Sequence, residues 1–192
     1  RALRRPRGAE PEPLAVAALR PARLERALFT AARRRLLLQD LHVAVGVLGE
    51  GLRTAHPPRS VRVRLGGFAH LPRLIDKARA TAAGKSGAYK YDCPMDKNFF
   101  AFTGITADAF LAEARRGGTD SAMLAWVRAN CLRLPAEIHA WSAWLEQNGP
   151  GGAPGHEWMA NTLKTVAPDR DDVRSFADLL DLDDYASFGG KG

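Results

Sequence analysis

The sequence of 192 residues has only two cysteines and no long apolar run. No stretch reaches about 18 apolar residues without a charge, so no membrane span is expected. Cys93 and Cys131 are too few for a disulfide scaffold, and no secretory signal pattern precedes them. We therefore expect reduced thiols and a cytoplasmic protein.

Residues 1–57 lack Lys, Met, Ile, Asn, Tyr, Trp and Cys altogether. They hold 11 Arg and 5 acidic residues, a net charge of +6, whereas residues 58–192 hold 17 Lys plus Arg and 16 acidic residues, a net charge of +1. The high overall charge therefore belongs to the first segment and not to the body. A composition suited to GC-rich codons, with a first Met at Met95, leads to the hypothesis that residues 1–57 are a disordered or spurious extension.

Two functional interpretations of this extension stay open. RALRRPRG is a possible basic arm for nucleic acid, and LERALFTAARRRLLLQDL is a possible amphipathic helix or transit-type peptide. The absence of Ser before Ser60 argues against the transit peptide. Pro57 and Pro58 exclude a helix at this point and mark the boundary of the extension. The body, residues 58–192, has almost no net charge and is therefore not expected to bind nucleic acid.

The body has the start and stop signals of short helices. Pro72 and Gly84 bound one helix, and Pro94 and Gly104 bound the next. Further starts are predicted at two threonines, a proline, a histidine and an aspartate: Thr106, Thr119, Pro135, His156 and Asp169. We predict a mainly all-α fold, a single bundle of about six or seven short helices with the Trp and Phe side chains in its core.

Several connecting segments are predicted to be irregular. VRVRL (61–65) is either a short edge strand or an extended lead-in, and GPGGAPG (149–155) is predicted to be a flexible loop. DDYASFGGKG at the end is predicted to be a tail whose Tyr185 and Phe188 fold back on the core. The acidic run Asp178, Asp181, Asp183 and Asp184 has no calcium-loop spacing and no central glycine, so a solvated helix end is expected.

No motif predicts a cofactor or a metal. GKS (84–86) follows a predicted helix and not a strand, and it lacks the upstream glycine of a phosphate-binding loop. HEWMA (156–160) begins like a zinc-protease helix, but Ala160 stands where the second histidine is needed. The five histidines show no ligand spacing.

The stretch YKYDCPMDKNFF (89–100) carries the strongest candidate site. Pro94 suits the first helical position, so Cys93 becomes the cap and Asp96 the third residue, near the free N–H groups. A thiol at this position can have a lowered pKa and act as a nucleophile, although Asp92 and Asp96 oppose the thiolate. The alternative is a small buried capping residue.

Other polar residues surround this stretch in sequence. Tyr89 and Tyr91 alternate, so with Asp96 their hydroxyls could hold a polar ligand or a cation; the alternative is aromatic packing on the core. Asp76, Lys77 and Arg79 form a charged face with Arg73 on the preceding helix, for which surface ion pairs are the default interpretation.

Together, LGGFAHLPRLIDKARA, the YxYxCPxDxxFFxFxG pattern, WSAWLEQ and DLDDYASFGG resemble the bacterial domain of unknown function 5069 family over about residues 57–192. The resemblance implies a small, mostly helical bacterial protein and no particular activity. The residues that match its motifs are Asp76, Lys77, Ala78, Arg79, Tyr89, Tyr91, Cys93, Pro94, Asp96, Phe99 and Gly104.

Three functions follow as hypotheses. The first is a binding module for a small molecule or a protein, with its site between the first body helix and the Tyr-Cys-Asp stretch. The second is a thiol-dependent or hydrolytic enzyme that uses Cys93 with Asp76, Lys77 or Tyr89. The third is a nucleic-acid binder that uses the basic arm.

Overall fold

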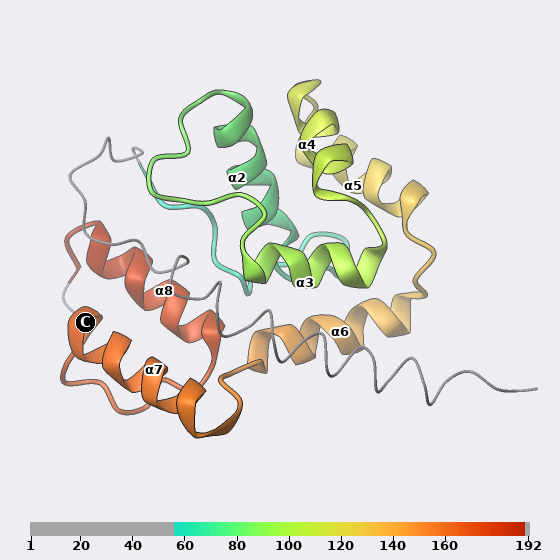
Figure 1. The fold of residues 1–192 in the computed structure, drawn as a ribbon. Helices are drawn as coiled ribbons and strands as arrows, with labels where there is room; N and C mark the ends of the chain where they lie inside the picture. Colours follow the sequence, from blue (N-terminus) through green and yellow to red (C-terminus); the bar gives the residue numbers. More distant parts are fainter. Residues whose placement is uncertain (1–55, 191–192) are drawn as a thin grey trace, which may run out of the picture. The chain divides into compact units, whose positions relative to one another are not determined.

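The computed structural model describes residues 56–190, which are mainly helical (Figure 1). The helices are α2 (Leu71–Ala82), α3 (Pro94–Thr103), α4 (Ala107–Arg115), α5 (Asp120–Asn130), α6 (Pro135–Gln147), α7 (Gly152–Val166) and α8 (Phe176–Ser187). The described part contains no strand; residues 61–65 contribute only an isolated bridge, between Leu65 and Phe68. The all-α prediction is confirmed there, while the predicted extension lies almost wholly outside the described residues.

The predicted helix starts are confirmed for α2 to α6, because each depends on groups close in sequence. The hydroxyls of Thr106 and Thr119 accept hydrogen bonds from the N–H groups of Ala109 and Ala122, both at 3.2 Å. Gly104 ends α3 with a positive φ of 78°, a conformation that glycine adopts without a steric penalty.

The prediction for the glycine-rich stretch 149–155 was wrong in its second half. Helix α7 begins at Gly152, so Pro154 lies within its first turn. The first N–H groups of a helix have no intrahelical partner, so a proline there removes no hydrogen bond.

The predicted start of the last helix, at Asp169, was also wrong. Helix α8 is capped by Ser175, whose hydroxyl accepts from the Asp178 N–H at 3.0 Å, while the Asp178 carboxylate accepts from the Ser175 N–H at 3.1 Å. The helix then continues to Ser187, so the predicted tail is largely helical. Tyr185 is 58% exposed and Phe188 39% exposed, so they do not fold back into the core.

Two apolar clusters form the interior. One takes side chains from α2 to α6 around Phe68, Phe99 and Phe110, and the other takes them from α3, α6, α7 and α8 around Leu145 and Ala177. Trp141 packs against both clusters, and it stacks on Phe102 with ring centroids 4.6 Å apart. Helix α6 therefore contributes to both halves of the interior.

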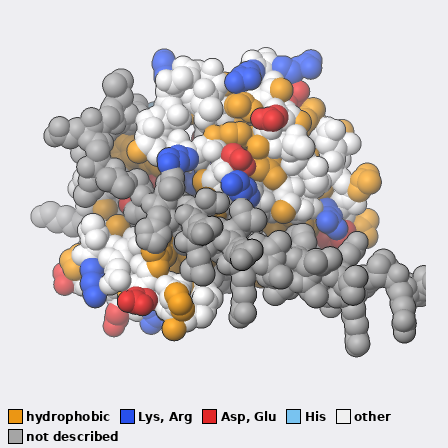
Figure 2. Space-filling model, in the orientation of Figure 1, with side chains coloured by type: hydrophobic (Ala, Val, Ile, Leu, Met, Phe, Trp, Pro, Cys, Tyr) orange, Lys and Arg blue, Asp and Glu red, His pale blue; other side chains and the backbone are white. Residues whose placement is uncertain are grey.

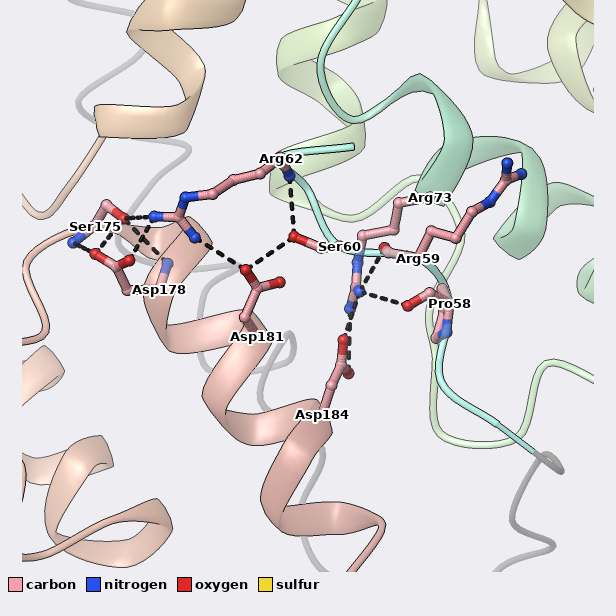
Figure 3. Close-up of polar contacts among 9 residues, drawn as sticks. All are labelled: Pro58, Arg59, Ser60, Arg62, Arg73, Ser175, Asp178, Asp181 and Asp184. Atoms are coloured by element: carbon pink, nitrogen blue, oxygen red, sulfur yellow. Dashed lines mark hydrogen bonds and ion pairs between the residues drawn. The ribbon is translucent and has the colours of Figure 1, made fainter. Parts of the chain in front are cut away.

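The segment that leads into α2 is held mainly by ion pairs. Val61 is fully buried, and its carbonyl accepts a hydrogen bond of 2.8 Å from the His70 N–H. Arg62 pairs with Asp178 and Asp181 of α8, and Ser60 also donates to Asp181, as Figure 3 shows.

Arg59 continues these ion pairs toward α2 and α5. Its guanidinium lies 2.7 Å from Asp76 and 2.5 Å from Asp120. We call this partly exposed set the peripheral seam: Arg59, Arg62, Asp76, Asp120, Asp178 and Asp181. The predicted solvated acidic helix end is wrong for Asp184, which is 6% exposed, whereas Asp178 and Asp181 pair with Arg62 and stay partly exposed.

Charges of both signs are interspersed on the face shown in Figure 2, which agrees with the small net charge of the body. Within residues 56–190, no helix is long and apolar enough to cross a bilayer.

Candidate functional site: the buried charged face of helix α2

Helix α2 buries two of its cations, contrary to the surface ion pairs predicted for this face. Arg73 is 3% exposed and Lys77 is 4% exposed. The two residues are four apart, so they lie on the same side of the helix. A buried cation without a partner is very unfavourable, and each of the two meets a carboxylate from another helix.

Lys77 pairs with Asp96, a fully buried residue in the first turn of α3. The Lys77 Nζ lies 2.8 Å and 2.7 Å from the two carboxylate oxygens. The fully buried His70 ring contacts the same carboxylate through Nε2 at 2.8 Å. We call His70, Lys77, Asp96 and the adjacent Cys93 the buried network.

The environment sets the charges within the buried network. Burial alone would raise the pKa of Asp96, but Lys77 and His70 outweigh it and lower the pKa to about 2. Burial alone would lower the pKa of Lys77, but the attraction of Asp96 and Cys93 outweighs burial and raises the pKa. Burial lowers the pKa of His70, so a neutral ring donates its Nε2–H to an ionised Asp96.

His70 also has an unusual backbone. It is the N-cap of α2, and its φ of 67° lies in the left-handed region. Its Nδ1 is buried and has no hydrogen-bond partner among the described residues. Strained residues with incompletely satisfied polar atoms persist only where the surroundings hold them, and they are frequent at functional sites.

Cys93 is the N-cap of α3, as predicted, and lies at the edge of this network. Its backbone N–H donates to Asp96 at 3.3 Å, and its Sγ lies 3.1 Å from the Lys77 Nζ. The lowered pKa expected for a nucleophile is not found. Burial and Asp96 together raise the pKa of the thiol, although Lys77 opposes them.

A second buried pair continues along the same face of α2. Arg73 lies 2.5 Å from Asp184 of α8, whose other carboxylate oxygen accepts a 2.9 Å hydrogen bond from the Tyr89 hydroxyl. The Arg73 guanidinium carbon is 5.7 Å from the centroid of the half-buried Tyr89 ring. Burial and Asp184 raise the pKa of Tyr89, so its hydroxyl remains a donor.

The remaining predicted residues lie elsewhere. Asp76 and Arg79 belong to the other side of α2, where Arg79 pairs with Asp120 at 2.7 Å. The Tyr91 hydroxyl donates to the Ala107 carbonyl at 2.8 Å, and its ring contacts Phe100 in the core. The two tyrosine hydroxyls therefore reach different elements and do not share a ligand site.

The structure thus brings together Lys77, Cys93 and Asp96, with Tyr89 over the neighbouring ion pair. Sequence reasoning missed His70 and the pairing of Arg73 with Asp184. His70 gave no signal beyond its place two residues before Pro72, and Asp184 is 111 residues from Arg73 along the chain.

Within the described residues, no group of three His, Cys, Asp or Glu side chains has a metal-binding arrangement. By its contacts, the buried network is a set of hydrogen-bonding and acid–base groups beside a thiol.

Comparison with known proteins agrees with the resemblance noted in the sequence. No curated protein matches the chain. A family model described as a domain of unknown function (DUF5069) matches residues 55–186, which include all seven described helices except the final residue of α8. The chain therefore belongs to the DUF5069 family.

Proposed function

We propose that this protein is a binding module for a small polar molecule, and that the molecule is held where Tyr89 and Cys93 lie over the charged face of α2. The observation that carries the proposal is the burial of Arg73 and Lys77 beneath two partly exposed polar side chains.

Stability alone is a weak reason for such an arrangement. Desolvation offsets most of the attraction in a buried ion pair, and apolar replacements of similar size are often neutral or stabilising. Perturbed pKa values and buried charges are frequent at functional sites, because fixed donors and acceptors recognise a ligand without reorganising. Cys93 and Tyr89 are only partly buried, and their side chains are the groups of this face that we propose contact the ligand.

Protection of Cys93 tests this proposal on the full chain. Small polar metabolites are screened for slowing the alkylation of Cys93 by iodoacetamide, and peptide mass spectrometry follows Cys131, in the apolar core, as an internal reference. We expect a protecting compound whose effect is weakened in Tyr89→Phe and kept in the control Tyr185→Phe. Failure of every compound, or equal protection in both variants, contradicts a site at this position.

A thiol-dependent enzyme is the second candidate, favoured by the 3.1 Å contact between Lys77 and Cys93. The raised pKa of the thiol opposes it. Alkylation measured across pH separates the two candidates. A midpoint well below about 8.5, the ordinary value for a thiol, supports nucleophilic chemistry, whereas slow labelling typical of a buried thiol removes it.

We also infer a bacterial, cytoplasmic protein. The free thiols Cys93 and Cys131 support a reducing compartment.

The nucleic-acid hypothesis concerns a basic arm in residues 1–8, outside the described residues. Loss of RNA or DNA retention at low salt on deletion of residues 1–56 would support it, and unchanged retention would remove it.

A further inference from the structure

An amine and a thiol are held in contact at the start of α3. The Lys77 Nζ lies 3.1 Å from the Cys93 Sγ. The amine belongs to a side chain that is 4% exposed and bound to both oxygens of Asp96, and the sulfur belongs to a helix cap. Both atoms therefore have little freedom to move apart.

We propose that Cys93 and Lys77 are a modification site, at which a hydroperoxide oxidises the sulfur and the two side chains then join through a reversible sulfur–nitrogen bond. This bond would close a loop across 16 residues and fix the start of α3 to α2. The proposal stands whether or not a small molecule binds nearby.

The first step is oxidation of the thiol. The sulfur attacks one oxygen of hydrogen peroxide, an S–O bond forms and the O–O bond breaks. Sulfur loses two electrons, the peroxide gains them, and the thiol proton leaves with the second oxygen as water. The product is a sulfenic acid, a species that condenses with nearby nitrogen or sulfur nucleophiles.

The second step is condensation with the amine. The Lys77 nitrogen in its neutral form attacks the sulfur, an S–N bond forms and the S–O bond breaks. The departing hydroxide takes one amine proton and leaves as water, so this step needs no further oxidant. A thiol reductant reverses the sequence by attacking the sulfur and releasing the amine. Because the two groups are already in contact, the reaction is intramolecular and competes well with further oxidation by peroxide.

The charged neighbours set the rate. Arg73 and Lys77 of α2 and Asp96 of α3 face the thiol, and Asp96 favours the protonated forms of both reacting groups. Both steps need a deprotonated nucleophile. We therefore expect slow linkage near neutral pH and faster linkage as the pH rises.

The test treats the full chain with hydrogen peroxide, blocks free thiols and maps peptides by mass spectrometry. We expect a linked pair containing Lys77 and Cys93, lighter than the two peptides together by two hydrogens and separated again by dithiothreitol. The matched variant is Lys77→Arg, which keeps a cation for Asp96 but removes the amine. Circular dichroism checks that this variant is folded, and Cys131 reports the general oxidation of thiols.

In Lys77→Arg we expect no linked pair, and instead a sulfenic acid at Cys93 that dimedone traps. Three results would overturn the proposal: Cys93 in the wild type oxidised to a sulfinic or sulfonic acid beside a free Lys77, Cys93 still reduced when Cys131 is oxidised, or a link that retains an oxygen atom.

Discussion

The buried network and the peripheral seam both pair aspartates with basic side chains, but in different surroundings. Asp96 in the network is fully buried and has both a lysine and a histidine partner, whereas Asp181 in the seam is 32% exposed and has Arg62 and Ser60. Water can replace the partners of Asp181 but not those of Asp96. The comparison teaches that a similar list of contacts carries very different energetic consequences when solvent is excluded.

Removal of Asp96 is expected to have the largest effect. Asp96→Ala leaves the Lys77 ammonium buried without a counter-charge, so we expect a loss of about 3–5 kcal/mol in the free energy of unfolding. Urea denaturation measures it, and Asp181→Ala is the matched control in the seam. Losses of similar size in the two variants would remove the distinction between the regions.

Replacement of both Lys77 and Asp96 should recover part of the stability that Asp96→Ala loses. Lys77→Met combined with Asp96→Leu removes both charges, so we expect a recovery of about 2 kcal/mol relative to Asp96→Ala. The recovery stays incomplete because the His70 ring then lacks an acceptor. A double-mutant cycle by urea denaturation gives the coupling, and a double variant no more stable than Asp96→Ala contradicts this account.

Acid should weaken the network in two stages. The pKa of His70 is lowered in the fold, so the unfolded chain binds its proton first and stability falls as the pH drops below about 6.5. The folded pKa of Asp96 is about 2, below its ordinary value of 3.8, so its contribution is present above that value and is lost as the pH falls toward 2. That second loss amounts to about 2 kcal/mol.

Urea unfolding at pH 7, 5, 3 and 2 measures both stages. His70→Asn, in which asparagine tolerates the left-handed backbone, should reduce the change in the free energy of unfolding between pH 7 and 5. If the free energy of unfolding depends on pH equally in His70→Asn and the wild type, His70 is not the source of the pH dependence.

The seam should give the smallest effect, and salt should remove it. Asp181→Ala is expected to lose about 0.2–1 kcal/mol at low ionic strength, because its pairs are partly exposed. In 1 M NaCl the Debye length falls to about 3 Å, so this loss should nearly vanish while that of Asp96→Ala persists. Thermal melts of both variants at two salt concentrations measure the difference, and equal salt sensitivity would contradict it.

The two errors in helix boundaries have local explanations. Ser175 and Asp178 form a reciprocal cap that is visible in the sequence, whereas Asp169 lies six residues before this cap and does not start a helix. A proline among glycines favours a loop, but Pro154 lies in the first turn of α7, where a proline is tolerated. Both features could have been recognised from sequence, since their hydrogen bonds join residues within one turn.

The candidate site was only partly predictable for a different reason. The cap at Cys93 and the position of Asp96 follow from Pro94, a neighbour in sequence. That Asp96 meets Lys77 and that Arg73 meets Asp184 depends on how α2, α3 and α8 pack. No periodicity distinguished these cations from the surface charges around them.

The helical class and most helix boundaries follow from local sequence, because caps, prolines and glycines act through hydrogen bonds and backbone conformations within a few residues. The packing of the helices determines which charges lose their water and which carboxylate replaces it. That outcome depends on contacts across 19 and 111 residues of chain, and burial is a property of the packed helices together.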